Sequence, residues 1–280
     1  MIDPLASRLS IFRPTGELVT EVAVPRVFEP MSPIGETMIG TYTPNLLSHD
    51  KILAEVDLAG GAILWRRELL TPSDVGLPED CGLSLSWGAI GQGGMATFGA
   101  CRSQLLFYPA DGNGEVAVIE APTYTGELPN PRDIDEYRHG ARFLYRDGVV
   151  PDAAVQAFAE APKTDRIPGR PMVYDESGRL WVGTRRDRDR FSYFDVYLDT
   201  VFAGTVQVRD RVMGFDILNG TLVTLVERAL DEHDGDGIPD RGIDWYDLGQ
   251  LSVLPGPATA PGTPPQPRPP GQGNARDPQA

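Results

Sequence analysis

The chain has 280 residues, of which 41% are hydrophobic and 23% are charged, a composition that supports one or two packed domains. Its net charge of -15 argues against a nucleic acid or an anionic membrane surface as the partner, because both would be repelled. Glycine (31 residues) and proline (26 residues) are too abundant for a helical bundle. No apolar run approaches the ~20 residues that cross a bilayer, so we expect no membrane span.

Short segments of alternating polar and apolar residues, separated by turn residues, predict β-hairpins along most of the chain. A first kind of hairpin covers 7–24, 52–67, 103–120 and 193–208. A second kind alternates with it and covers 83–100, 172–184 and 212–228. The last of these turns at Asn219 and Gly220, the favoured pair for a two-residue type I′ turn.

A hairpin of the second kind followed by one of the first makes a four-stranded antiparallel sheet. Phe12, Val56 and Phe107 occupy matching places and stand 44 and 51 residues apart. A four-stranded unit that repeats every ~40–50 residues is the sequence signature of a β-propeller blade. We therefore predict an all-β fold, a β-propeller of four-stranded antiparallel blades with a short helical insert.

One segment also resembles a known repeat. Residues 175–184 read D-E-S-G-R-L-W-V-G-T, which resembles the D-x-x-G-x-L-W-V-G-T repeat of bacterial sensor-type and NHL-like propellers. Residues 7–12, with Gly16 and Glu17 after them, resemble the outer hairpin of the same family. The resemblance covers roughly residues 3–250 and implies a six-bladed parent.

Four to five blades are recognisable, which is fewer than six. They are an outer hairpin at the N-terminus, blades near 36–70, 83–122 and 171–208, and a last blade of three strands that ends at 242–248. An open ring leaves bare edge strands, an aggregation liability. We therefore expect the C-terminal part of a longer protein, whose missing part carried any export signal. The alternative is a smaller ring, closed by the N-terminal hairpin pairing with the last strand.

Two regions lie outside the hairpins. We assign residues 1–252 to the propeller and residues 253–280 to a disordered tail, because that tail is rich in proline and glycine and buries too little apolar area to order. Residues 123–168 are too long for a loop and predict a helical insert. Its first helix is indicated by Asn130 as cap, Pro131, and the spacing of Ile134, Tyr137, Ala141 and Leu144 up to Gly148; its second helix spans 151–161. This insert either packs an apolar stripe on the propeller or forms a lid.

The strongest local signal is the acidic stretch 231–247, which has seven acids and one arginine, a net charge of -6. Like charges packed this densely repel unless a cation or solvent relieves them. Hard divalent cations prefer clustered carboxylate and carbonyl oxygens, and glycine permits the tight turn. Two interpretations stay open, a calcium-binding loop and a solvated acidic loop.

The D-G-D-G-I-P-D run within this stretch resembles the calcium loops of thrombospondin type 3 and dockerin-like repeats. The resemblance implies Ca²⁺ as cofactor, held by side chains at loop positions 1, 3, 5 and 9 and by a carbonyl at position 7: Glu232, Asp234, Asp236, Asp240 and Ile238. Position 1 is Glu instead of Asp, and position 12 is Ile243, where an acidic ligand is expected. These departures predict an affinity in the ~10⁻⁴–10⁻³ M range.

Two cysteines, Cys81 and Cys101, flank the predicted hairpin whose turn is near Gln92. They could therefore face each other across paired strands, within reach of a disulfide. An exported protein would oxidise them and a cytosolic one would not, so both states stay open. The G-x-G-x-x-A run from Gly91 to Ala96 is interpreted as the hairpin turn, since poor helix formers follow it.

The arginine-rich loop 185–190 has four Arg against two Asp, and it is predicted to be a solvated, self-paired loop, with anion binding as the alternative. In an up-and-down blade, this loop, the acidic loop and the helical insert all emerge on one rim. We therefore expect one shared binding face, since charged loops on a rigid scaffold are where recognition usually sits.

Enzyme signatures such as G-x-S-x-G and H-E-x-x-H are missing. We expect a non-enzymatic binding or interaction module in an exported bacterial protein, periplasmic or extracellular, with a protein or small molecule as partner. The alternative is a metal-dependent hydrolase, because calcium-dependent lactonases of propeller fold collect Glu, Asn and Asp around the central channel. Asp175 and Asp216 are candidates for such a cluster, although Asp175 also fits a turn cap.

Overall fold

The computed structural model describes residues 2–3, 7–44, 51–69, 74, 76–77, 83–91, 94–109, 113–167, 171–228 and 240–251. The predicted tail 253–280 lies outside these residues. So do most of the acidic stretch and Cys81.

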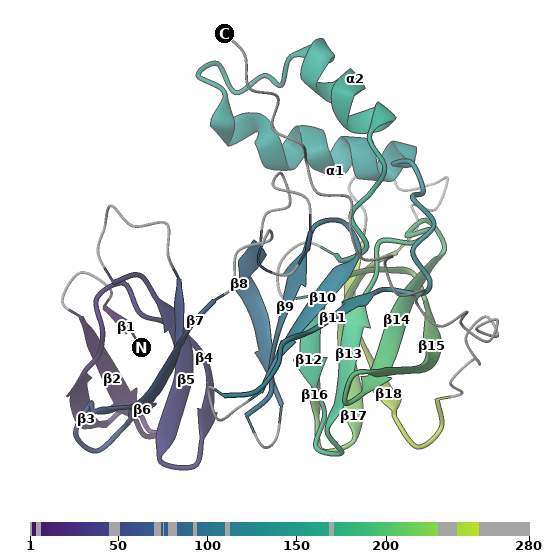
Figure 1. Ribbon diagram of the computed structural model, residues 1–280. Coiled ribbons are helices and arrows are strands. Elements are labelled where there is room, and N and C mark those ends of the chain that lie inside the picture. Colours follow the sequence, from purple (N-terminus) through teal and green to yellow (C-terminus); the bar gives the residue numbers. More distant parts are fainter. Residues whose placement is uncertain are drawn as a thin grey trace, which may run out of the picture.

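Five antiparallel sheets follow one another along the chain (Figure 1). The first has three strands, β1 (Ile2–Asp3), β2 (Arg8–Phe12) and β3 (Leu18–Ala23). Three four-stranded sheets follow: β4 (Glu29–Ile34), β5 (Thr37–Tyr42), β6 (Ile52–Asp57) and β7 (Ile63–Glu68); β8 (Leu83–Ile90), β9 (Ala96–Ala100), β10 (Gln104–Tyr108) and β11 (Ala117–Glu120); β12 (Met172–Tyr174), β13 (Arg179–Gly183), β14 (Phe191–Leu198) and β15 (Val201–Arg209). The last sheet has β16 (Arg211–Leu218), β17 (Thr221–Glu227) and β18 (Arg241–Asp247).

These sheets are arranged as propeller blades. Within each sheet, neighbouring strands pair in chain order, so every blade is an up-and-down meander. The first strands of successive blades meet, because β4 contacts β8, β8 contacts β12, and β12 contacts β16. Innermost strands that meet in this way surround an axis, as in a propeller. The predicted all-β fold of four-stranded antiparallel blades with a short helical insert is confirmed.

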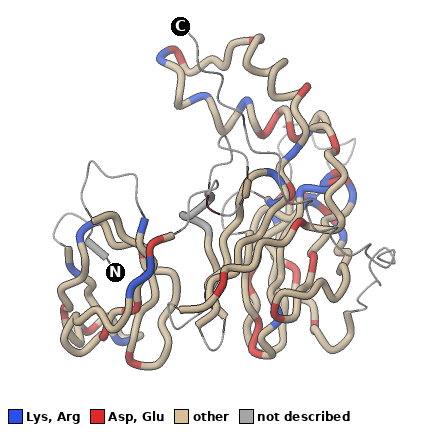
Figure 2. The backbone as a smooth tube through the Cα atoms, in the orientation of Figure 1, with Lys and Arg blue, Asp and Glu red and all other residues tan. Residues whose placement is uncertain are grey.

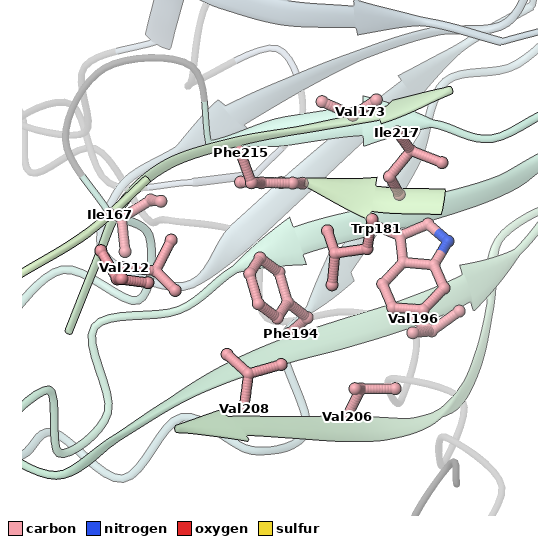
Figure 3. Close-up of a cluster of buried hydrophobic side chains, with 12 residues drawn as sticks. Ile167, Val173, Trp181, Phe194, Val196, Val206, Val208, Val212, Phe215 and Ile217 are labelled. Carbon is pink, nitrogen blue, oxygen red and sulfur yellow. The ribbon is translucent and has the colours of Figure 1, made fainter. Parts of the chain in front are cut away.

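The largest apolar core joins the blade β12–β15 to the sheet β16–β18 (Figure 3). Phe194 on β14 lies with its ring centroid 4.7 Å from that of Phe215 on β16, edge to face. Trp181 on β13 is 1% exposed, and its ring centroid lies 6.4 Å from that of Phe194, also edge to face. Because each strand places alternate residues on this face, the period of two that predicted the strands also supplies the core.

Turn chemistry confirms the predicted hairpins. Asn219 and Gly220 have φ of 51° and 70°, the positive values that a type I′ turn requires between β16 and β17. Gly91 donates from its N–H to the carbonyl of Met95 at 2.8 Å, between two antiparallel strands and with no helix after it. The G-x-G-x-x-A run is therefore a hairpin turn and not a dinucleotide loop.

The innermost strand of the second blade was missed from the sequence. β4 contains Pro30 and Pro33, and proline argues against a strand because it lacks a donor for the ladder. In the structure the register shifts between Pro30 and Ser32, so the strand is irregular there. Gly40 on β5 lies opposite, where a Cβ would come within 2.5 Å of the Phe28 ring.

The helical insert stands above the blades as a hairpin of two helices, α1 (Pro131–Ala141) and α2 (Asp152–Glu160), with a 3₁₀ turn over Arg142–Leu144 (Figure 1). Asn130 caps the start of α1, as expected, and forms a capping box with Asp133. Tyr137 and Phe158 stack between the helices with centroids 4.3 Å apart. Neither described helix is long and apolar enough for a transmembrane segment.

The apolar stripe, one of the two interpretations of the insert, is not observed beneath its two helices. The only buried residues of α1 are Asp133 and Ala141, and the only one of α2 is Val155. An apolar stripe cannot hold the hairpin to the blades with so few buried side chains. The attachment is made by charged groups at its base, described next.

Candidate binding face

The insert and the arginine-rich loop share one face, as expected. Asn130 donates from its side-chain amide to the carbonyl of Asp187 at 2.7 Å. Arg132 donates to the carbonyl of Asp189 at 3.0 Å. Glu127 accepts from the N–H of Asp187 at 3.0 Å. The third expected member of this face, the acidic loop, lies outside the described residues apart from Asp240.

Asp133 is the centre of the attachment. Its side chain is fully buried, and its carboxylate lies 2.8 Å from the ammonium of Lys163 and 3.2 Å from the guanidinium of Arg211. Arg185 and Arg188 follow at 3.7 and 3.9 Å. Asp133 thus contacts three parts of the chain: the segment after α2, the arginine-rich loop and β16, the first strand of the last sheet.

Glu136, one turn later on α1, supplies a second carboxylate. It lies 2.5 Å from Arg211 and 3.3 Å from Arg188. We call Asp133, Glu136, Lys163, Arg185, Arg188 and Arg211 the anchor network. Figure 2 shows basic residues gathering where the helical hairpin meets the blades.

The prediction that the arginine-rich loop is solvated and self-paired is wrong. Arg188 is 0% exposed, and burial together with the neighbouring Arg211 lowers its pKa to about 10. Its guanidinium also donates to the carbonyl of Val212 at 3.0 Å. Arg188 is buried between the loop and α1 because α1 places two carboxylates over the loop. A buried cation needs such partners.

Burial by itself would raise the pKa of Asp133. The hydrogen bond and charge of Lys163, the backbone N–H of Asn130 and the charge of Arg211 together outweigh burial and hold that pKa below its usual value. Asp133 is therefore ionised at neutral pH.

A second polar cluster lies below the base of the insert, around Asp195 on β14. Its carboxylate accepts from Arg186 at 2.7 Å, from Thr205 at 2.7 Å and from the hydroxyl of Thr123. Burial raises the pKa of Asp195, while Arg186 and the two hydroxyls oppose that rise. Thr123 belongs to the start of the insert, so this cluster also ties the insert to the blade.

Asp165 is the unusual member of this region. It is 3% exposed, and no hydrogen-bond donor among the described residues reaches either of its carboxylate oxygens. Burial and the charge of Asp195 raise its pKa to about 7. The shallow pocket beside it, which Tyr124, Lys163 and Arg185 also line, has about 10 Å³ of free space, enough for one water molecule.

The far end of the hairpin is the exposed part of this face. Phe143, Leu144 and Val149 are 79%, 71% and 63% exposed. Arg142 and Arg146 lie between and beside them and are also exposed. We call these five residues the hairpin tip.

The predicted calcium ligands are largely untested by the structure. Glu232, Asp234, Asp236 and Ile238 lie outside the described residues. Asp240 is exposed, and its carbonyl accepts from the N–H of Arg228 at 2.9 Å, where β18 begins. Among the described residues there is no group of three or more His, Cys, Asp or Glu that could hold a metal ion.

The two candidates for an axial carboxylate cluster are engaged elsewhere. Asp175 caps the β12–β13 turn, where its carboxylate accepts from the N–H groups of Ser177 and Arg179, both at 2.9 Å, and from the indole of Trp181 at 2.9 Å. Asp216 is exposed and accepts from the N–H of Ile217. The turn-cap interpretation of Asp175 is confirmed.

Cys101 is disulfide-bonded. The chain's other cysteine, Cys81, lies outside the described residues.

Sequence reasoning missed the anchor network. Its members stand up to 78 residues apart, as for Asp133 and Arg211, so no local pattern joins them. One signal was available, because the chain has only two lysines and Lys163 stands directly after Pro162, the proline that follows the second helix of the insert.

No protein-family model matches the chain, and no curated protein matches it. Solved structures that are similar include hydrazine synthase of Kuenenia stuttgartiensis (TM-score 0.41, 11% identity, 80% of this chain and 48% of that one) and Sqt1 of Saccharomyces cerevisiae (0.41, 9%, 88% and 54%). A protein of Listeria monocytogenes EGD-e, lmo1340, is a third (0.39, 8%, 87% and 57%). This chain spans about half the length of each. With TM-scores under 0.5, the propeller assignment rests on the chain's own strand order and blade contacts.

Proposed function

We propose that this protein is a non-enzymatic binding module and that the hairpin tip is its contact surface. The observation that carries the proposal is the exposure of Phe143, Leu144 and Val149 on a hairpin whose base is fixed by buried ion pairs. Contiguous exposed apolar side chains rimmed by charge are typical of interaction sites.

The anchor network explains why a small, exposed hairpin would be suited to binding. The helices contact each other and bury little, so apolar packing alone would leave their orientation loose. Asp133 and Glu136 fix the base of α1 to the blades instead. A surface held in one orientation before binding loses less entropy when a partner docks.

The alternative, a metal-dependent hydrolase using the central channel, needs carboxylates or amides that converge on the axis. Asp175 and Asp216, the two candidates for it, serve a turn and the surface. Their placement favours the binding module.

We also propose that the module belongs to the bacterial NHL-like, six-bladed kind of propeller and acts in the periplasm or outside the cell. The motif 175–184 forms the β12–β13 turn and strand that the resemblance implies, which supports the first point. The disulfide-bonded state of Cys101 supports the second, because disulfides persist in oxidising compartments.

Selection of phage-displayed random dodecapeptides against the protein tests the proposal. The enriched peptides are measured against the double variant Phe143→Ser/Leu144→Ser and against Leu218→Ser, which changes an equally exposed leucine (66%) on a blade turn. We expect the double variant to lose at least tenfold in affinity and Leu218→Ser to bind as the wild type does. Failure to enrich any peptide, or equal binding to all three proteins, would contradict the proposal.

A further inference from the structure

The charges of the hairpin tip differ in sign from those of the molecule as a whole. Residues 138–149 contain three arginines and one aspartate, whereas the chain carries a net charge of -15. Arg138 is paired with Asp135 at 3.3 Å. Within the described part of the chain, Arg142 and Arg146 have no carboxylate partner. The aspartate, Asp147, accepts from the N–H of Val149 at 3.1 Å and shapes the turn.

From this arrangement we infer that the hairpin tip binds a protein segment in which an apolar side chain is flanked by Asp or Glu. The inference rests on the proposed function and adds the chemistry of the partner. Phe143 and Leu144 supply apolar contact area, and the neighbouring guanidiniums of Arg142 and Arg146 match carboxylates, which they can bind in a bidentate manner.

Two exposed apolar residues on the last sheet have a different electrostatic environment. Ile243 and Trp245 on β18 are 59% and 69% exposed. The nearby arginines are already occupied, since Arg228 pairs with Asp244 at 2.7 Å and Arg241 with Glu227 at 3.1 Å. An acidic segment therefore finds guanidinium groups without a carboxylate partner at the hairpin tip. The arginines near Ile243 and Trp245 are already paired with carboxylates.

The length of α1 separates the hairpin tip from the carboxylates that attach the insert. The 11 residues of α1 span about 16 Å at ~1.5 Å per residue, and Asp133 lies in its first turn. The Debye length at physiological ionic strength is about 8 Å, so a short segment at the tip is largely screened from Asp133. A bilayer or a long polyanion contacts a wide area and meets the acidic blades as well. Two copies meeting tip to tip would oppose arginine with arginine.

The test uses the peptides enriched on the full-length protein. We expect Asp or Glu next to an aromatic or aliphatic residue in these peptides, and a fall in affinity of at least fivefold between 50 and 500 mM NaCl. The double variant Arg142→Glu/Arg146→Glu is expected to lose at least tenfold in affinity, while Arg13→Glu, on the exposed β2–β3 turn, keeps wild-type affinity.

Several outcomes would overturn the inference. Peptides that require Phe143 and Leu144 but are neutral and bind independently of salt would refute the acidic partner and leave the binding module standing. Binding to phosphatidylglycerol vesicles that is lost in the charge-reversal variant would assign the hairpin tip to a membrane. Self-association that is lost in Phe143→Ser/Leu144→Ser, seen by sedimentation, would assign it to a second copy.

Discussion

The ammonium of Lys163 lies 2.8 Å from a carboxylate oxygen of Asp133, and both side chains are buried. The pair joins the segment after α2 to the first turn of α1, so the two ends of the hairpin are fixed to each other as well as to the blades. Lys163 also donates to the carbonyls of Arg185 and Asp187, at 3.1 and 3.2 Å. Removing Lys163 therefore takes the nearest cation from Asp133 and one donor from each of these two carbonyls.

Replacing Lys163 by Met should loosen the insert while the blades stay folded. Loss of one partner from a buried charged group typically costs about 1–3 kcal/mol, and Arg211 at 3.2 Å still compensates part of the charge of Asp133. Hydrogen exchange over 131–160 should become faster, and exchange in β12–β15 should not. Arg13→Met is the control, since it removes a 2.7 Å pair whose side chains are 62% and 63% exposed and should cost below about 1 kcal/mol. Equal effects from the two substitutions would contradict this account.

Acid should release the insert before it unfolds the blades. The pKa of Asp133 is lower in the folded protein than the ordinary aspartate value of 3.8. Unfolding then takes up a proton, so the stabilisation is complete above pH ~4 and is lost as the pH falls through the folded pKa. The protection factors of the amides of α1, measured from pH 6 down to 3, should show this loss. In Asp133→Asn, these protection factors should be low already at pH 6 and should change little as the pH falls.

Asp165 should make the protein less stable as the pH rises. Its carboxyl titrates near 3.8 when unfolded and near 7 when folded, so the folded state binds more protons between these values. The free energy of unfolding therefore falls from pH 4 to pH 7, by an amount on the order of 4 kcal/mol. Asp165→Asn should remove this slope and raise the melting temperature at pH 8. Asp135→Asn, an exposed aspartate, should leave the slope as it is in the wild type.

The hairpins could be predicted because strand period and turn residues are local properties of the sequence. Asn219-Gly220 and the segment 175–184 each determine their own turn, and both were placed correctly. β4 was missed because Pro30 and Pro33 contradict the local rule, and only pairing with β5 makes it a strand.

The candidate site could not be predicted in the same way. The shared face of the insert and the arginine-rich loop followed from blade topology, and it was right. The burial of Arg188 did not follow, because a charged residue is assigned to the surface by default. Asp133 and Glu136 reach Arg188 only because α1 lies above the loop. No local sequence pattern encodes that position of α1.

Gly61, in the β6–β7 turn, should not tolerate alanine. Its φ is 75°, and a Cβ there would lie 2.2 Å from the carbonyl oxygen of Ala23 at the end of β3. Left-handed strain adds about 1–2 kcal/mol to this clash. Gly16 is the matched control, with φ of 85° and nothing within 4 Å of its Cβ position. Chemical denaturation should show Gly61→Ala to be the more destabilising of the two by at least 1 kcal/mol. A difference close to zero would mean that the first two blades do not contact each other at this turn.

Calcium should raise the melting temperature if the acidic loop binds it through Glu232, Asp234, Asp236, Asp240 and the carbonyl of Ile238. Binding only to the folded state stabilises it by mass action, and at 10 mM Ca²⁺ a site of ~10⁻³ M affinity adds about 1.4 kcal/mol. Asp236→Ala should remove the shift, and 10 mM Mg²⁺ should give a smaller one. No shift at 10 mM Ca²⁺ would assign the loop to solvent.

The anchor network occupies the base of the hairpin, and the five residues of its tip take no part in the network. Substitutions at the tip therefore do not remove the ion pairs that attach the hairpin to the blades. Related chains can diversify what they recognise by changing a few codons at the turn, and an engineer can graft a foreign epitope there, with the scaffold underneath unaltered.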